Sequence, residues 1–230
     1  MIFNHYIFFD FETGSRNPET TQPTQLSAIA IDSRKLTIIP NGIFNSYMRP
    51  ELDDAKAIEL GLDPVEDGAL EVTKITREQL VDAPLPETVW KNFVFWAAQF
   101  NRGGGTGEWS KSIPAGFNIV NFDLPIVKKL CERYKTASPF HPLHKKDIMN
   151  DVYNFTENVK INDNDSMSMD SIRKWMGIDD KDAHNAKKDV LDGAFLLIKF
   201  IKMYRYFYPK IKFKDSFSKE NEEIKKLMKE

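Results

Sequence analysis

The segment HYIFFDFETGS, residues 5–15, places two carboxylates directly after a run of apolar residues. A short apolar run without polar alternation is typical of a strand that is covered on both faces of a sheet. Side chains two positions apart on a strand point to the same face, so Asp10 and Glu12 would stand side by side. Burying ionised carboxylates is costly, and two negative charges this close repel each other. The segment therefore predicts a strand whose end carries an acidic pair with something positive between the two side chains.

Composition limits the classes of protein to consider. The chain has 230 residues, 41% of them hydrophobic, which suits one packed domain with at most a short appendage. The net charge of -2 does not indicate a nucleic-acid partner, so a polyanion would have to be held locally or through bound cations. The single cysteine, Cys131, excludes an internal disulfide and fits a reducing compartment. Because no apolar run could span a membrane and no secretory signal is recognisable, we expect a cytoplasmic protein.

The pattern along the chain predicts leading strands, followed by helices with one later strand between them. Strands are expected at residues 6–9, 25–32, 42–50 and 113–119, with a turn at the IPNG sequence of residues 39–42. Helices are expected at residues 86–100, 122–134, 169–177 and 186–208, and loops at residues 101–112 and 156–166. This order indicates an α/β layered domain, residues 1–208, followed by a charged C-terminal tail, residues 209–230.

Apolar residues at helical spacing predict the buried side of three of these helices. The expected stripes are Val89, Phe93, Trp96 and Phe100; Leu124, Val127, Cys131 and Tyr134; and Val190, Ala194, Leu197, Ile201 and Tyr204. We interpret the aromatic stripe, which also includes Trp90, as core packing rather than as a binding surface. Cys131 is likewise interpreted as a core residue and not as a nucleophile.

Three further residues are candidates to join the acidic pair. Asp123 follows a strand at the start of a helix, where the helix macrodipole stabilises an ionised carboxylate. His184 and Asp189 lie five positions apart at the start of the last helix and would diverge on a continuous helix. They converge only if His184 lies in the preceding loop, an arrangement for which Asn185 is a suitable N-cap.

These residues suit a particular chemistry. Carboxylate ligands from separate elements are what Mg²⁺ or Mn²⁺ prefers. Two such ions about 4 Å apart would activate water on one side and stabilise the leaving oxygen on the other. His184 would then serve as general base, because the pKa of histidine lies near neutrality.

The segments DFET, GFNIVNFD and HNAKKD resemble the three exonuclease motifs of the DEDD superfamily, in its histidine (DEDDh) branch. That branch includes the proofreading epsilon subunit of bacterial DNA polymerase III, exonuclease I and oligoribonuclease. The resemblance covers residues 1 to about 207, with the usual soft element boundaries. It implies a ribonuclease-H-like fold: a five-stranded mixed sheet, flanked by helices, with the second strand antiparallel. It also implies two-metal hydrolysis from a 3′ end that releases nucleoside 5′-monophosphates.

The resemblance also implies roles for individual residues. The carboxylates would be metal ligands, His184 the general base, and two residues of the first motif would meet the terminal nucleotide, mostly through backbone. The ligands are Asp10, Glu12, Asp123 and Asp189, and the nucleotide contacts are Phe11 and Thr13. The tyrosine branch would need Tyr where this chain has Asn185, so His184 assigns the branch.

Two further segments extend the resemblance, and some positions depart from it. The window ALEVTKITREQL, residues 69–80, resembles the segment that shapes the pocket for the terminal nucleotide, and Asp147 resembles the residue that starts the helix after the second motif. TGS replaces the frequent Thr-Thr-Gly, and the unusual residues are Lys74, Asn185 and Lys187. These departures affect pocket contacts and leave the five catalytic residue types intact.

Each motif alone has an ordinary structural explanation, such as a solvated strand end or a helix cap, and only their conjunction favours an exonuclease. DNA is the favoured substrate, as single strands or frayed ends. The same chemistry on RNA stays open, because no motif here reads the 2′ hydroxyl. A non-catalytic scaffold or proofreading subunit of a polymerase complex is the third alternative, and the intact catalytic residues argue against it. The basic stretch of residues 199–214 is either a phosphate track or a solvated helix face.

Overall fold

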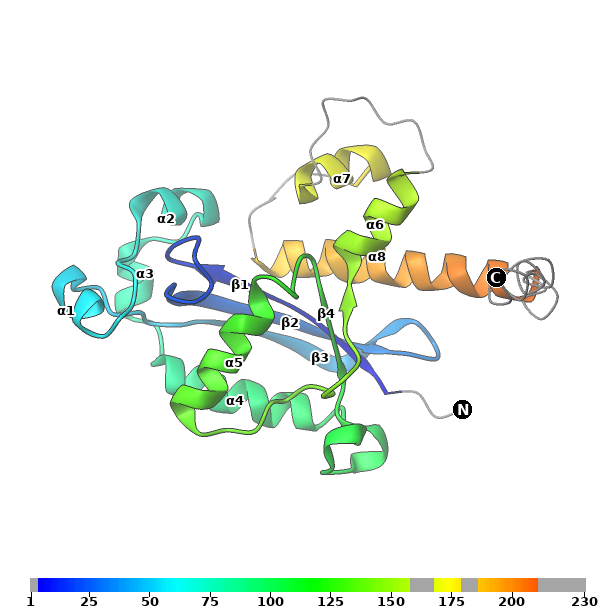
Figure 1. Ribbon diagram of the computed structural model, residues 1–230, viewed down its shortest axis with the longest axis horizontal. Coiled ribbons are helices and arrows are strands. Elements are labelled where there is room, and N and C mark those ends of the chain that lie inside the picture. Colours follow the sequence, from blue (N-terminus) through cyan, green and yellow to red (C-terminus); the bar gives the residue numbers. More distant parts are fainter. Residues whose placement is uncertain (1–3, 158–167, 179–185, 211–230) are drawn as a thin grey trace, which may run out of the picture.

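The computed structural model describes residues 4–157, 168–178 and 186–210, which form a five-stranded sheet with helices on both faces (Figure 1). The strands are β1 (Tyr6–Thr13), β2 (Pro23–Asp32), β3 (Thr37–Tyr47), β4 (Ile113–Gly116) and β5 (Lys146–Asp147), in the order β3-β2-β1-β4-β5. Strand β2 is antiparallel to both β1 and β3, whereas β1, β4 and β5 are parallel. The predicted mixed sheet with an antiparallel second strand is therefore confirmed.

The helices divide into two layers and one group at the end of the sheet. Their bounds are α1 (Asp54–Glu59), α2 (Asp67–Thr73), α3 (Arg77–Val81), α4 (Pro86–Ala98), α5 (Asp123–Tyr134), α6 (Ile148–Thr156), α7 (Met169–Met176) and α8 (Ala186–Phe207), with short 3-10 turns at Arg102–Gly104, Glu108–Ser110 and Tyr208–Lys210. Helices α4 and α5 cover one face of the sheet, and α8 runs along the other with α6 and α7 beside it (Figure 1). Helices α1, α2 and α3 gather at the end of the sheet where β1 finishes (Figure 1).

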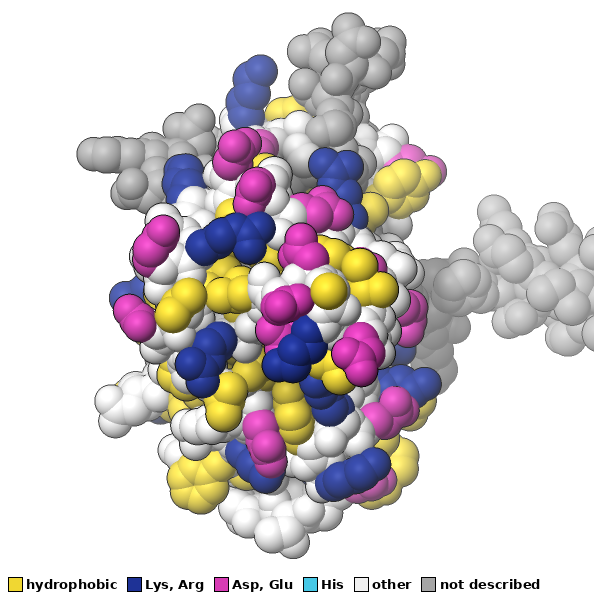
Figure 2. All heavy atoms as spheres, turned by 90° about the vertical axis from the view of Figure 1, so that its left-hand side faces the viewer, with side chains coloured by type: hydrophobic (Ala, Val, Ile, Leu, Met, Phe, Trp, Pro, Cys, Tyr) yellow, Lys and Arg dark blue, Asp and Glu magenta, His cyan; other side chains and the backbone are white. Residues whose placement is uncertain are grey.

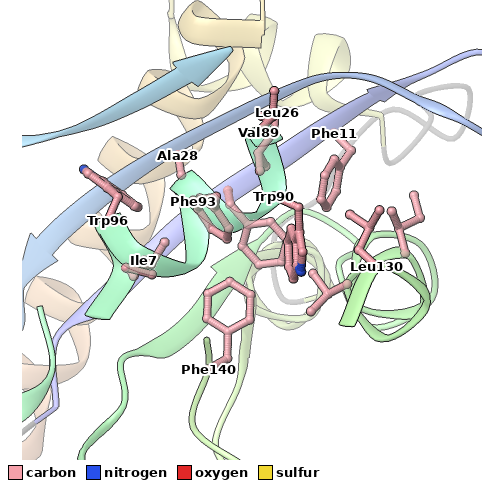
Figure 3. Close-up of a cluster of buried hydrophobic side chains, with 14 of the residues drawn as sticks. Ile7, Phe11, Leu26, Ala28, Val89, Trp90, Phe93, Trp96, Leu130 and Phe140 are labelled. Carbon is pink, nitrogen blue, oxygen red and sulfur yellow. The ribbon is translucent and has the colours of Figure 1, made fainter. Parts of the chain in front are cut away.

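The face under α4 and α5 carries an aromatic core (Figure 3). Trp90 and Phe93 are fully buried, and the ring of Phe93 stacks on that of Trp96 at 5.6 Å between centroids. Phe9 of β1 stacks on Phe140 at 4.8 Å. The predicted aromatic stripe of α4 is thus confirmed as core packing.

Helix α5 is rotated slightly from the orientation that its apolar spacing predicts. Val127 is buried as expected, whereas Ile126 and Leu130 lie deeper than the predicted stripe. The other three predicted members, Leu124, Cys131 and Tyr134, are only partly buried against the same core. This rotation places Asp123, the first residue of the helix, on the buried side as well.

The opposite face packs against α8. The first four members of its predicted stripe, from Val190 to Ile201, are buried. A Cβ added at Gly193 would lie 2.2 Å from the ring of Phe8, so only glycine allows this close approach to β1. The prediction for Tyr204 is wrong: its side chain is 42% exposed, and its hydroxyl donates to Asp151 of α6 at 2.9 Å. The last turns of α8 extend beyond the buried core, and Tyr206 is also exposed.

The predicted turn at residues 39–42 is also wrong. The chain turns at residues 33–36, and β3 runs through the IPNG sequence. Ile29 pairs with Ile43 but Ile31 pairs with Ile38, so the extra residues of β3 form a bulge. Asn41 adopts a left-handed conformation with φ 58°, the kind of local distortion that a bulge absorbs. A turn-forming sequence has here become an irregularity within a strand.

Four other predictions can be compared with this fold. No helix among the described residues is long and apolar enough to cross a membrane. The helix of residues 169–177 is confirmed, and it ends at Gly177 with φ 63°. The boundary between a domain of residues 1–208 and a tail of residues 209–230 stays a prediction, because residues 211–230 lie outside the described residues. The same holds for most of the polar loop expected at residues 156–166.

Candidate active site

The acidic pair lies within β1 and not beyond its end. Asp10 pairs with Ser27 of β2 and Glu12 with Gln25, and both acidic residues are partly buried. Burial raises the pKa of Asp10 to about 7; the charge of Asp189 adds to this shift and that of Arg173 opposes it. Burial raises the pKa of Glu12 to about 8, reinforced by the charges of Asp10 and Asp189. Without a cation, burial and the neighbouring carboxylates thus disfavour the ionised form of both side chains.

Asp123 joins this pair from the other side of the sheet. Its side chain is 2% exposed, and Oδ1 accepts a hydrogen bond of 3.0 Å from the backbone N–H of Phe11. Burial raises its pKa well above the usual range, the charge of Asp10 adds to the shift, and the Phe11 N–H opposes it. The position at the start of α5 therefore does not offset the effect of burial on this pKa, although the macrodipole favours the charge. The hydrogen bond fixes the start of α5 against β1.

The two residues predicted to contact a nucleotide differ in how accessible their side chains and backbone N–H groups are. The side chain of Phe11 belongs to the aromatic core (Figure 3), and its N–H is already engaged by Asp123. Thr13 lies at a register shift of β1, and its hydroxyl donates to the carbonyl of Ser15 at 2.9 Å. Thr13 is consequently the more accessible of the two, and the nucleotide-binding role of both stays a prediction.

The predicted pocket segment packs next to this turn. The N–H of Glu66, immediately before α2, donates to the carbonyl of Gly14 at 2.9 Å. A Cβ at Gly14 would lie 3.0 Å from the side chain of Val65, so the two backbones approach closely. Helices α2 and α3, which contain the window of residues 69–80, pack on the same small apolar cluster as Val65. The segment is thereby placed beside the end of β1.

Asp189 approaches the pair from the first turn of α8. Its charge raises the pKa values of both Asp10 and Glu12, so the three carboxylates lie close enough to interact. Arg173 of α7 donates from Nη2 to Oδ1 of Asp189. Arg173 is 1% exposed and also binds Asp192, a residue that is 6% exposed.

Arg173 and Asp192 were not predicted from the sequence as part of the site. A signal for Arg173 was nevertheless present, because it occupies the apolar side of α7 with Ile172 and Met176. A charged residue in an apolar stripe requires a buried partner. Nothing in the spacing identifies Asp192 as that partner, since it lies on another helix.

The remaining predicted site residue cannot be placed. His184 lies outside the described residues, as does Asn185, its expected neighbour at the helix N-cap. The proposed convergence of His184 with Asp189 thus stays a prediction from the sequence.

Asp147 has a structural role that links the second motif to the site. It caps α6, as predicted, and Oδ1 accepts from Met149 at 3.1 Å. The same oxygen accepts from the N–H of Asn118 at 2.9 Å, and Oδ2 accepts from that of Val120 at 3.2 Å. Asp147 therefore fixes the segment between β4 and α5 that leads into Asp123.

The chemistry of this donor set fits divalent cations. Four carboxylates from β1, α5 and α8 act on one another's charge, and an oxygen-only donor set of this kind favours Mg²⁺ or Mn²⁺. Two of them have pKa values raised to about 7 and about 8, as expected for carboxylates that lack a counter-charge. Within the described ranges, no group of three or more His, Cys, Asp or Glu side chains is already arranged to hold a metal ion. A bound cation would have to draw these carboxylates closer together.

The surface at this end of the molecule has mixed charge. Acidic, basic and apolar side chains are interspersed over the face that carries α1, α2 and α3 (Figure 2). This agrees with the nearly balanced composition of 32 basic and 34 acidic residues. Recognition of a polyanion here would depend on the local site and not on a broad basic surface.

The sheet order, the antiparallel second strand and the two helical layers define a ribonuclease-H-like fold. Solved structures of exonuclease I share it. E. coli exonuclease I in complex with a dT13 oligonucleotide has a TM-score of 0.67 and 20% sequence identity, over 89% of this chain and 43% of that chain. The zinc-bound form of the E. coli exonuclease I complex with single-stranded DNA has a TM-score of 0.67 and 20% identity, over 90% and 42% of the two chains.

Apo exonuclease I gives a similar result, with a TM-score of 0.66 and 20% identity over 90% of this chain and 44% of that chain. The chain thus spans less than half the length of these exonuclease I structures. No family model matches the sequence, and no curated protein matches it. At this level of identity, the likeness shows the fold.

Proposed function

We propose that the chain is a metal-dependent 3′→5′ exonuclease of the DEDDh type. It hydrolyses DNA, preferentially single strands, and releases nucleoside 5′-monophosphates. The observation that carries this proposal is the mutual effect of four carboxylates from β1, α5 and α8 on one another's pKa values, in a fold like that of exonuclease I. The single-stranded DNA bound by E. coli exonuclease I supports DNA over RNA as the substrate.

The four carboxylates would hold two divalent cations, Mg²⁺ or Mn²⁺. The ligands are Asp10, Glu12, Asp123 and Asp189. When bound, the ions supply positive charge that activates the attacking water and stabilises the leaving oxygen. The raised pKa values of Asp10 and Glu12 support this assignment, because burial and the nearby carboxylates disfavour their ionised forms until a counter-charge is present.

The chain's own residues would complete the reaction around this centre. His184 takes the proton from the attacking water, a role that rests on the HNAKKD motif alone. Thr13, at the end of β1, lines the position of the 3′-terminal nucleotide. The apolar cluster of α2 and α3 supports the turn that follows β1 and would form the wall of that pocket.

The experiment is degradation of matched 5′-labelled DNA and RNA oligonucleotides with Mg²⁺, with Mn²⁺ and with a chelator. We expect the DNA to shorten stepwise from its 3′ end only when a metal is added. The Asp10→Asn variant serves as the control for a contaminating nuclease. RNA degraded in preference to DNA would overturn the assigned substrate. Absence of cleavage with either metal, or cleavage that persists in chelator, would overturn the proposed function.

A further inference from the structure

Arg173 of α7 is a buried arginine that contacts three carboxylates through three different nitrogens. Nη1 donates to Asp170 at 2.9 Å, Nε donates to Asp192 at 2.9 Å, and Nη2 donates to Asp189. With 1% of its surface exposed, the guanidinium is removed from water and depends on these partners. The contact links the short helix α7 to the first turns of α8.

The two contacts on α8 differ in what surrounds them. Asp192 is buried, and both of its oxygens also accept from Lys188, at 2.6 and 2.7 Å. Asp192 is therefore anchored by two cations and cannot turn away without leaving charge unpaired in the interior. Asp189, one turn earlier, is more exposed, and its charge acts on the acidic pair of β1. The arginine thus bridges an anchored carboxylate and a carboxylate of the candidate metal site.

We propose that Arg173 is a positioning residue that holds the Asp189 carboxylate toward Asp10 and Glu12, so that the three side chains can share a metal ion. This inference rests on the proposed function. The planar guanidinium fixes three hydrogen-bond directions at once, which the point charge of a lysine does not. Groups behind a metal ligand that orient it in this way typically change metal affinity or activity by about 10–100-fold when they are removed.

The test is a Mn²⁺ titration of the full chain, followed by electron paramagnetic resonance, for wild type, Arg173→Gln and Arg173→Lys. We expect Arg173→Gln to raise the Mn²⁺ dissociation constant by about 10–100-fold. The dissociation constant of Arg173→Lys should lie between those of wild type and Arg173→Gln, because lysine keeps the positive charge but not the three fixed hydrogen-bond directions. Lys174→Gln, at an exposed position of the same helix, is the matched control and should bind Mn²⁺ as wild type does.

Kinetics separate positioning from general damage to the fold. In Arg173→Gln, the Mn²⁺ concentration needed for half-maximal cleavage should rise, while KM for the oligonucleotide stays close to that of wild type. If this variant is unfolded at the assay temperature, the double variant Arg173→Gln with Asp192→Asn replaces it. That pair removes the buried opposite charges together and still deprives Asp189 of its arginine.

The outcomes distinguish this inference from the proposed function. A folded Arg173 variant that binds Mn²⁺ as tightly as wild type, with wild-type cleavage intact, overturns the positioning role alone. A wild-type protein that neither binds Mn²⁺ nor cleaves DNA with metal overturns the proposed function and this inference with it. Weaker Mn²⁺ binding in both the single and the double variant, with Lys174→Gln unchanged, supports the positioning role.

Discussion

The two sides of the candidate site hold a carboxylate against the same acidic pair by different means. On the α5 side, Asp123 is buried and receives a neutral backbone N–H from Phe11. On the α7 and α8 side, Asp189 is partly exposed and receives a charged guanidinium from Arg173. One carboxylate is thus held by the backbone of the sheet, and the other by a side chain from a separate helix.

The difference has consequences for charge. A backbone donor stabilises an ionised carboxylate only partly, and burial still raises the pKa of Asp123 well above the usual range. A guanidinium brings a full positive charge, and Arg173 lowers the pKa of Asp10 against the effects of burial and Asp189. On the α5 side, a hydrogen bond fixes the position of Asp123, but its negative charge is poorly compensated. On the α8 side, Arg173 compensates the negative charge of Asp189, whose position depends on that one ion-pair network.

Replacing the two aspartates in turn tests this comparison most directly. Asp123→Asn and Asp189→Asn should each lower turnover by more than about 100-fold. Loss of a residue that only orients a metal ligand typically costs up to about that much. Their stabilities should move in opposite directions. Asp123→Asn removes a repelling buried charge and should keep or raise Tm without metal, whereas Asp189→Asn leaves Arg173 with one carboxylate fewer and should lower Tm.

Turnover on a labelled DNA oligonucleotide and thermal melts in chelator measure both effects. Asp82→Asn, an exposed acidic residue at the end of α3, is the control for removing a negative charge elsewhere. A variant with wild-type turnover would contradict the metal-ligand role of that residue. A large drop in Tm for Asp123→Asn would show that its bond to Phe11 is structural, and the proposed contrast between the two sides would fail.

His184, which precedes α8 in the sequence, would add a proton acceptor to the α8 side of the site. His184→Ala should lower turnover by about 10²–10⁴-fold, the usual range for a lost general base. The proton of the attacking water then has no side-chain acceptor, while substrate and metal ligands are retained. Single-turnover hydrolysis across neutral pH should show a rate that rises through the histidine titration in wild type and loses this rise in the variant.

Binding of the oligonucleotide, measured in the presence of Ca²⁺ to prevent turnover, should be nearly unchanged in His184→Ala. His144→Ala is a matched histidine control, because His144 is exposed and its ring stacks on that of His141. A variant that retains the full rate, or that loses affinity in place of rate, would refute the role of general base.

The raised pKa values of Asp10 and Glu12 predict how the stability of the metal-free protein depends on pH. Asp10 and Glu12 have folded-state pKa values raised from 3.8 and 4.5 to about 7 and about 8, so the folded state retains protons that the unfolded state releases. Their contribution to stability is complete below the unfolded values and is lost as pH rises through the folded ones. Tm in chelator should therefore fall as pH rises from 4.5 to about 8, and these two groups should cause no further fall above that.

Two measurements sharpen this pH prediction. Mn²⁺ should oppose the fall, because ligands must lose their protons to bind a metal and binding to the folded state stabilises it. The double variant Asp10→Asn with Glu12→Gln should show a smaller fall than wild type in chelator. An equal pH slope in the two proteins would mean that other groups cause it.

The fold could be largely predicted from sequence, for physical reasons that are local, and the same local signals select the acidic residues as candidates. The apolar run of β1 and the helical spacing of apolar residues in α4 and α8 follow from which residues of each element are buried. Such a pattern can be recognised within the element itself. The failures occurred where a distant partner decides the outcome. Tyr204 finds its partner on α6, and the bulge at Asn41 depends on its pairing with β2.

The site divides in the same way. Asp10, Glu12 and Asp123 lie in short motifs next to the strands and the helix that position them. The role of Arg173 becomes clear only from its contacts, because its ion-pair partners lie 16 and 19 residues away along the chain. A charged residue in an apolar stripe indicates a buried partner, but the sequence does not say which one.

We expect the smallest effect on turnover from Asp147, whose side chain accepts hydrogen bonds from the backbone of the segment that leads into α5. Asp147→Asn keeps Oδ1, which accepts from Asn118 and Met149, and loses only the acceptor for the N–H of Val120 at 3.2 Å. Because that N–H is exposed to water, the loss should cost about 0.5–1 kcal/mol, the low end for a single hydrogen bond. Tm should fall by about 1–4 °C, and turnover by less than threefold, since Asp123 keeps its own bond to Phe11.

Asp147→Ala removes all three acceptor contacts and the cap of α6, and should cost about 1–3 kcal/mol. If the α5 side is fixed mainly by the Phe11 bond, both Asp147 variants will lose stability in this graded way while most of the turnover is retained. Thermal melts and turnover measured on the same preparations give the comparison. A loss of turnover as large as that of Asp123→Asn would instead show that the segment between β4 and α5 positions Asp123. The α5 side would then depend on a distant side chain, as the α8 side depends on Arg173.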